Sequence, residues 1–135
     1  MIIEYVSKNI ESNSQNQMHS NRIDTYVTKL FFYLFTGTQG GINRLRILLL
    51  LTEKPRNAHQ ITKALEIDYK TVAYHLSLLQ KNNLILSVGK KYGAIYCLSF
   101  FFEHNIESFN RIILKLYKEH KKTYKTSPDN MQEGK

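Results

Sequence analysis

The amino-acid sequence predicts a mainly α (α+β) fold, built from several helices and one two-stranded β-hairpin. Two observations lead to this class. Most apolar residues recur every three or four positions, which is typical of helices that bury one side. Residues 84–99 instead contain two runs of β-branched and aromatic residues with a glycine-bounded loop between them, which is typical of a hairpin.

Composition favours one domain with a polyanionic partner. The chain has 135 residues, of which 42% are hydrophobic, enough to bury a core. Its formal net charge is +8, and the excess is concentrated: residues 41–100 hold nine basic and three acidic residues, whereas residues 1–40 hold three of each. Such a basic segment indicates nucleic acid or an anionic membrane surface as partner.

Several classes of protein are disfavoured by what the sequence contains. The single Cys97 allows neither an intrachain disulfide nor a cysteine zinc site and indicates a reducing, cytoplasmic setting. The N-terminus lacks the basic start and apolar run of a signal peptide, and the longest apolar runs are too short to span a membrane. Because no catalytic motif occurs, we expect neither an enzyme nor a cofactor.

Residues 1–21 are expected to form a flexible N-terminal arm, because residues 7–22 are polar and rich in Ser, Asn and Gln. A helix is expected over residues 22–36, where Ile23, Val27, Leu30 and Leu34 step by four, three and four. Added aromatic residues make its apolar face broader than one-sided packing requires. This helix is therefore either a core helix with a wide face or one shared between two subunits.

Three further helices are expected in residues 41–83. The first runs from Ile42 to Leu51 and ends before Pro55. The second covers Ala58 to Glu66, with Asn57 as its N-cap, and the third runs from Tyr69 to Lys81, with Asp68 as its N-cap. Asn82 and Asn83 can supply the left-handed residue that closes the third helix. The residues expected to point inward are Ile42, Leu45, Leu48, Leu49, Ile61, Ala64, Leu65, Val72, Leu76 and Leu79.

A hairpin and a last helix complete the chain. The hairpin strands are expected at residues 84–88 and 94–99, and a helix at residues 101–121, where apolar residues alternate in steps of four and three. Residues 122–135 show no periodicity and are expected to form a loose tail. The residues expected at a dimer interface are Val27, Leu30, Phe31 and Leu34 from the first helix and Ile106, Phe109, Ile113 and Leu116 from the last.

The order of elements over residues 41–100 is that of a winged helix-turn-helix: three helices followed by a two-stranded wing. Within it, Ile61-Thr62-Lys63-Ala64-Leu65, Ile67-Asp68, Lys70-Thr71-Val72, His75-Leu76, Leu79 and Asn83-Leu84-Ile85 resemble the ArsR-type transcriptional regulators, especially small archaeal members. The wing's end, Tyr96-Cys97-Leu98-Ser99, resembles the return strand of that family. The resemblance implies a homodimeric DNA-binding regulator whose terminal helices form the dimer contact.

The sequence departs from the family pattern at two glycines and in its cysteines. The family often has glycine in the turn and before the wing, where this chain has Glu66 and Asn83. The cysteine motifs of the metal-sensing members are absent, so metal sensing does not carry over. The sequence indicates no particular small-molecule effector.

The third helix is expected to enter the major groove of double-stranded DNA. Lys70 can donate to a guanine or a phosphate, Thr71 can contact thymine, and Tyr74 can reach a phosphate or a base edge. Arg44 and Arg46 are candidate phosphate contacts. The residues expected to contact DNA are Tyr69, Lys70, Thr71, Tyr74 and His75 on the helix, Arg56, His59 and Gln60 before it, and Lys90, Lys91 and Tyr92 in the wing.

Two other functions remain open from the sequence. One is a winged-helix module that binds proteins through its outer helices and has no sequence-specific DNA binding. The other is a peripheral membrane protein that uses residues 30–35, although that segment carries little positive charge. His104, Glu107, Glu119 and His120 are better explained as surface residues than as a metal site.

Overall fold

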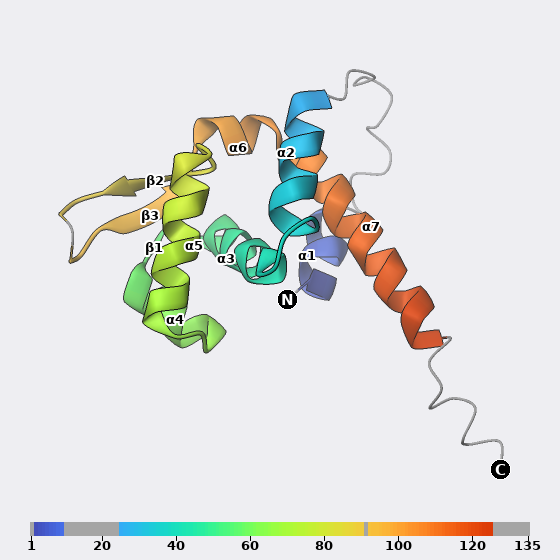
Figure 1. Ribbon diagram of the computed structural model, residues 1–135, viewed down its shortest axis with the longest axis horizontal. Helices are drawn as coiled ribbons and strands as arrows, with labels where there is room; N and C mark the ends of the chain where they lie inside the picture. Colours follow the sequence, from blue (N-terminus) through green and yellow to red (C-terminus); the bar gives the residue numbers. More distant parts are fainter. Residues whose placement is uncertain (1, 10–24, 91, 126–135) are drawn as a thin grey trace, which may run out of the picture. The chain divides into compact units, whose positions relative to one another are not determined.

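The computed structural model describes residues 2–9, 25–90 and 92–125, which belong to two compact units (Figure 1). The larger unit spans residues 24–106, and the smaller combines residues 1–23 with residues 107–135. The helices are α1 (Ile2–Asn9), α2 (Thr25–Phe35), α3 (Gly41–Glu53), α4 (Ala58–Leu65), α5 (Tyr69–Lys81), α6 (Phe100–His104) and α7 (Ile106–Lys125), and the strands are β1 (Arg56–Asn57), β2 (Ile85–Val88) and β3 (Ile95–Leu98).

The larger unit is a winged helix-turn-helix, as the sequence predicts. Helix α3 packs against α2, α4 and α5, and the hairpin of β2 and β3 extends away from these helices (Figure 1). The apolar stripes of the helices meet in the core, where Leu45, Leu48, Ile61, Leu76 and Leu79 are almost completely buried. Burying these side chains is the main favourable contribution to folding.

Two residues expected in the core lie on the surface. Ile42 is 53% exposed and Ala64 is also exposed. Helix α3 turns a different side inward, because Gly41, Arg44, Leu45 and Leu48 form its buried stripe and leave Ile42 outside. On α4, Ile61 and Leu65 are one turn apart and fill the contact without Ala64.

The wing is part of a three-stranded antiparallel sheet with strand order β1-β3-β2. Ile85 pairs with Leu98 and Val88 with Ile95, close to the expected hairpin, while Arg56 on the additional strand β1 pairs with Tyr96. A two-residue strand has no periodicity of its own, which is why the sequence did not predict β1. Strand β1 thus connects the loop-side half of β3 to the segment that leads into α4.

The helix expected at residues 101–121 is in fact two helices. Ser99 caps α6 by accepting from the Phe102 amide at 3.0 Å, and Asn105 ends it, with its side-chain amide donating to the Phe101 carbonyl at 2.9 Å. Phe102 packs against Phe31, with ring centroids 5.9 Å apart. The regular spacing of apolar residues continued across this break, so the periodicity alone did not predict it.

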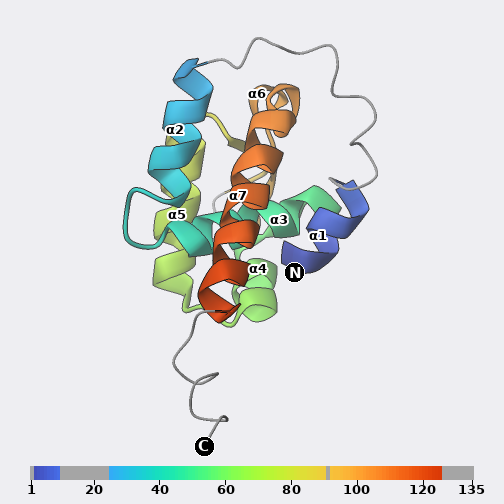
Figure 2. The ribbon, with the colours of Figure 1, turned by 90° about the vertical axis from the view of Figure 1, so that its right-hand side faces the viewer.

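The smaller unit joins the two ends of the chain through α1 and α7, the latter seen along most of its length in Figure 2. Tyr5 packs edge-on against Phe109, with ring centroids 6.1 Å apart, and its hydroxyl donates to Asn110 Oδ1 at 2.6 Å. Burial raises the pKa of Tyr5 to about 12. Tyr5 thus ties α1 to α7.

The prediction of a flexible N-terminal arm at residues 1–21 was wrong for residues 2–9. These residues form α1, whose side chains Tyr5 and Val6 are buried. Residues 10–21 lie outside the described residues. At the other end, the expected tail began too early, since α7 continues to Lys125; residues 126–135 again lie outside the described part. Among the described residues, no helix is long and apolar enough to cross a membrane.

Most of the residues expected at a dimer interface lie in the chain's own interior. Leu30, Ile106 and Leu116 are half-buried, and the fully buried ones are Val27, Phe31, Leu34, Phe109 and Ile113. The wide apolar face of α2 is divided: its central stripe is used within the chain, and Tyr26, Phe32 and Tyr33 remain exposed. Buried side chains cannot contact a second subunit, so the expectation was wrong for those five.

Candidate nucleic-acid interface

Helix α4 begins with a capping box that orients the helix-turn-helix. Asn57 Oδ1 accepts from the Gln60 amide at 2.8 Å, and Gln60 Oε1 accepts in return from the Asn57 amide at 2.9 Å. These two bonds satisfy backbone donors that a helix start leaves unpaired. Gln60 was expected to contact DNA, but its side-chain oxygen is committed to this cap.

The turn between α4 and α5 depends on a left-handed residue. Glu66 has φ 55 and ψ 43 at the end of α4, the conformation for which glycine is the usual choice. Asn83, after α5, has φ 61, which confirms the prediction that the Asn82-Asn83 pair closes that helix. At both positions where the ArsR-type family often has glycine, this chain has a left-handed backbone with a different residue, Glu66 or Asn83.

Asp68 begins α5 and restrains Thr71. Asp68 Oδ2 accepts from the Thr71 amide at 3.0 Å, and Asp68 Oδ1 accepts from the Thr71 hydroxyl at 2.6 Å. These hydrogen bonds, first from the Thr71 side chain and then from its backbone, lower the pKa of Asp68 and keep it ionised. The hydroxyl proton of Thr71 is therefore held by Asp68.

Helix α5 separates a buried face from an exposed one. Its buried residues are Val72, His75, Leu76 and Leu79, whereas Tyr69 and Tyr74 are 55% and 62% exposed and Lys70 is also exposed. The outward residues expected from the sequence therefore lie where a groove of DNA could meet them. His75 does not: only 4% of it is exposed, so it is not placed to contact DNA, because positions 72, 75, 76 and 79 together form the inward stripe.

His75 faces the buried side chain of Arg44. The Arg44 Nη1 and His75 Nδ1 atoms are 3.3 Å apart, and Arg44 Nε donates to the Leu34 carbonyl at 2.8 Å. Only 2% of Arg44 is exposed, so the expectation that it contacts phosphate was wrong. Arg46 is half-buried and donates to the Leu65 carbonyl at 3.0 Å, where it caps the end of α4.

The wing is anchored at its base and exposed at its tip. At the base, Ser99 donates to the Asn83 carbonyl, and Gln80 Nε2 on α5 lies 3.0 Å from Ser87 Oγ on β2. At the tip, Gly89 has φ 102, Lys90 is exposed and Tyr92 is 95% exposed. Lys91, the third residue expected to contact DNA from the wing, lies outside the described residues.

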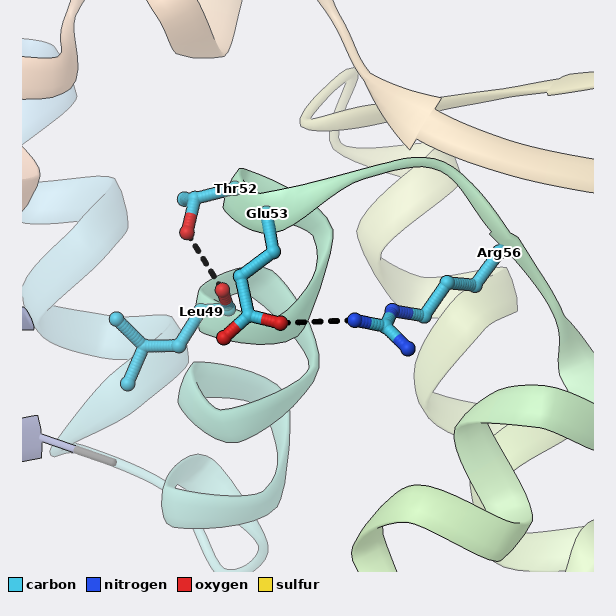
Figure 3. A network of polar contacts seen from close by, with 4 residues as sticks. All are labelled: Leu49, Thr52, Glu53 and Arg56. Carbon is cyan, nitrogen blue, oxygen red and sulfur yellow. Dashed lines mark hydrogen bonds and ion pairs between the residues drawn. The ribbon is translucent and has the colours of Figure 1, made fainter.

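Arg56 was also expected to contact DNA, but it is used within the fold (Figure 3). Its Nη2 atom lies 2.8 Å from Glu53 Oε2 in an ion pair across the α3–β1 connection, and its side chain is 17% exposed. In the same turn Thr52 Oγ1 donates to the Leu49 carbonyl at 2.5 Å. By contrast, His59 is exposed near the start of α4 and stays available for contact with a phosphate.

Exposed basic and aromatic side chains occur on both α5 and the wing tip. Those on α5 are Tyr69, Lys70 and Tyr74, with Thr71 half-buried among them, and those at the wing tip are Lys90 and Tyr92. Lysine and tyrosine donors of this kind suit phosphates and the edges of bases. Among the residues that the structure describes, no three His, Cys, Asp or Glu side chains gather to hold a metal ion.

Comparison with known proteins agrees with this geometry. Residues 43–87 match the family described as "Bacterial regulatory protein, arsR family". The match covers most of α3, all of α4 and α5, and most of β2. No curated protein sequence matches the chain.

Solved structures resemble the chain in fold. HlyU from Vibrio cholerae is 18% identical, with 67% of this chain and 97% of that one covered at a TM-score of 0.50. M. tuberculosis Rv0081 is 15% identical, with 73% and 98% covered at 0.51. Mb0332 from Mycobacterium bovis, described as a homodimeric winged helix-turn-helix DNA-binding domain and a possible ArsR-family transcriptional regulator, is 18% identical, with 75% and 92% covered at 0.50.

Proposed function

We propose that this chain, a DNA-binding transcriptional regulator with an arsR-type helix-turn-helix, binds its operator as a cytoplasmic homodimer and places one α5 in the major groove of each half-site. The observation that carries the proposal is the division of α5 into two faces. Val72, Leu76 and Leu79 fix the helix to the core, while Tyr69, Lys70 and Tyr74 project from it. N-terminal residues of such a helix reach base edges.

In this proposal the contacts have different roles. Lys70 and the Thr71 methyl contact bases, and Tyr74 contacts a phosphate or a base edge. His59 and the wing residues Lys90 and Tyr92 contact the sugar-phosphate backbone or the minor groove and fix the position of the protein. Lys91 is included in the wing contact by its place in the sequence.

Two observations support the homodimer: an exposed aromatic face on α2 and the description of a protein with a similar fold. Tyr26, Phe32 and Tyr33 give α2 an exposed aromatic face, and aromatic residues are enriched at protein interfaces. Mb0332, which shares the fold, is described as homodimeric. We assign residues 41–100 as the DNA-binding domain and the exposed face of α2, with the half-buried Leu30 and Ile106 of the same unit, as the dimer contact.

Selection of bound fragments from random DNA tests the proposed function. We expect one enriched motif with two-fold symmetry and half-sites centred about one helical turn, roughly 34–36 Å, apart. Binding should weaken steeply with salt, because each neutralised phosphate releases counterions. A pool without any enriched motif would refute sequence-specific regulation and favour a protein-binding module, and a monomeric mass on the enriched motif would refute the dimer.

Lys90→Ala is expected to weaken binding to all DNA sequences by a similar factor. Since one phosphate contact is lost per subunit, the slope of log K against log salt should fall by about 0.9 for each contact. Fluorescence anisotropy with operator and random duplexes between 50 and about 200 mM salt measures it. Lys54→Ala, which removes an exposed lysine between α3 and β1, is the matched control and should leave the slope unchanged. If the salt slopes of Lys90→Ala and Lys54→Ala are equal, the wing does not contact DNA through Lys90.

A further inference from the structure

We propose that Arg44 is a positioning residue for DNA recognition, which fixes the rotation of α5 through His75 and so sets where Tyr74 meets the DNA. The inference rests on the proposed function and extends it to two residues that cannot contact DNA themselves, since Arg44 and His75 are 2% and 4% exposed. It starts from the hydrogen bonds of the buried guanidinium.

Arg44 joins three parts of the larger unit. From α3 its Nε donates to the Leu34 carbonyl in the last turn of α2, and its Nη2 donates to the Thr38 hydroxyl and, at 3.5 Å, to the Gln39 carbonyl. Its Nη1 faces His75 on α5 at 3.3 Å. The end of α2, the connection to α3, and α5 therefore all depend on one side chain.

The guanidinium is buried with dipoles as its partners. Within the described part of the chain no carboxylate forms an ion pair with Arg44. The carbonyl of Leu34 belongs to the C-terminal turn of α2, where the helix dipole favours a cation. A buried charge that loses its polar partners strongly destabilises the fold. We therefore expect the groups that accept hydrogen bonds from Arg44 to stay close to their observed positions.

This arrangement fixes the protonation of His75. Arginine has donors and no acceptor, so His75 Nδ1 accepts the hydrogen bond and the ring is neutral with its proton on Nε2. Burial, and then the charge of Arg44, lower the pKa of His75. A protonated ring would place a second cation beside the guanidinium and break the hydrogen bond.

The ring of His75 is also confined by Gly40. A Cβ atom on Gly40 would lie 2.8 Å from His75 Cε1, and Gly40 has φ +84, so glycine is needed there for both space and conformation. The ring of Tyr74 lies edge-on to that of His75, with centroids 5.3 Å apart. Because the two residues are neighbours on one helix, any rotation of α5 that moves His75 also moves the exposed Tyr74.

Two non-titrating substitutions of His75 separate positioning from folding. In His75→Asn the side-chain oxygen takes the place of Nδ1 and can accept from Arg44, whereas His75→Leu removes the acceptor at similar volume. The measured quantity is the ratio of operator affinity to random-DNA affinity at constant salt, at about pH 7.5 and at a series of lower pH values, with circular dichroism to confirm the fold at each. A general loss of folded protein lowers both affinities, but a misplaced α5 lowers their ratio.

At pH 7.5 we expect the ratio to stay near that of the wild type for His75→Asn and to fall by about 10-fold for His75→Leu, the effect of one lost base contact. As the pH falls through the lowered pKa of His75, the ratio should fall for the wild type and stay level for His75→Asn. The titratable and charged groups that face the contact between Arg44 and His75 are Arg44 itself from α3, Tyr74 on α5 and Tyr33 near the end of α2.

The sign of the pH effect follows from the lowered pKa. Since His75 has a lower pKa in the folded chain than its ordinary 6.5, the stability that the neutral ring contributes is present above about pH 6.5 and is lost as the pH falls toward the lowered value. A His75→Leu variant as selective as the wild type, or equal pH dependence in the wild type and His75→Asn, would overturn the positioning role. A wild-type chain with no preferred operator would refute the proposed function instead.

Discussion

Phe31→Ala is expected to lower the free energy of unfolding by about 3–5 kcal/mol, the usual cost of removing a large buried aromatic side chain. Phe31 is fully buried and packs against Phe35 and Phe102, with ring centroids 5.7 and 5.9 Å apart. It therefore joins α2 to α6 across the base of the winged helix. Since small domains are stable by only about 5–15 kcal/mol, this variant should unfold at a much lower urea concentration.

Phe100→Ala is the matched control for Phe31→Ala. Phe100 lies on α6, two residues before Phe102, but it is 79% exposed, and its ring stacks on His104. An exposed phenylalanine contributes within about 0.5 kcal/mol. Urea unfolding followed by circular dichroism compares the two, and similar midpoints would show that the aromatic packing of α2 on α6 is not as described.

Lys70→Ala is expected to weaken operator binding by about 10- to 100-fold, or roughly 1–3 kcal/mol, and to relax selectivity at one base position of each half-site. Lys70 is exposed in the first turn of α5 and can donate to guanine O6 and N7. Random-DNA binding should change much less, since there only a phosphate contact is lost. Anisotropy titrations with the selected operator and with single-base variants measure both effects.

Lys54→Ala again removes the same charge outside α5 and the wing, so any effect of net charge alone appears in both variants. Thr71→Val is the companion substitution. It keeps a methyl group and removes the hydroxyl that donates to Asp68 at 2.6 Å, so operator selectivity at a thymine should be retained. If Lys70→Ala and Lys54→Ala have equal effects on the operator, α5 does not contact the bases through Lys70.

The fold was predictable from the sequence wherever a local signal determines local structure. Asn57 and Asp68 cap α4 and α5, and Asn83 is left-handed after α5. The β-branched and aromatic runs of residues 84–99, with glycines bounding the loop between them, predicted the hairpin. The break at Asn105 was not predictable from periodicity. Apolar residues follow the same steps of four and three before and after it, from Phe102 in α6 into α7. What ends α6 is the cap geometry of Asn105, together with the packing of Phe102 on Phe31.

The candidate interface was predictable only in its exposed part. The outward positions of Tyr69, Lys70 and Tyr74 follow from the spacing of Val72, Leu76 and Leu79. An arginine in an apolar helix gives no sign in the sequence of whether it is solvated or buried, and burial of Arg44 depends on the end of α2 and the connection after it. His75 was expected to contact DNA for a similar reason: its partner Arg44 is 31 residues away in the chain, so the sequence did not indicate that the ring is buried.

Protection of guanine N7 from methylation on the selected operator tests most directly whether α5 lies in the major groove, because N7 is accessible only there. With the wild-type chain, protected guanines should appear in two half-sites centred about one helical turn apart, and Lys70→Ala should restore methylation at one guanine in each. Full methylation of every guanine in the wild-type complex, at concentrations that saturate the operator, would contradict the assignment of α5 as the recognition helix.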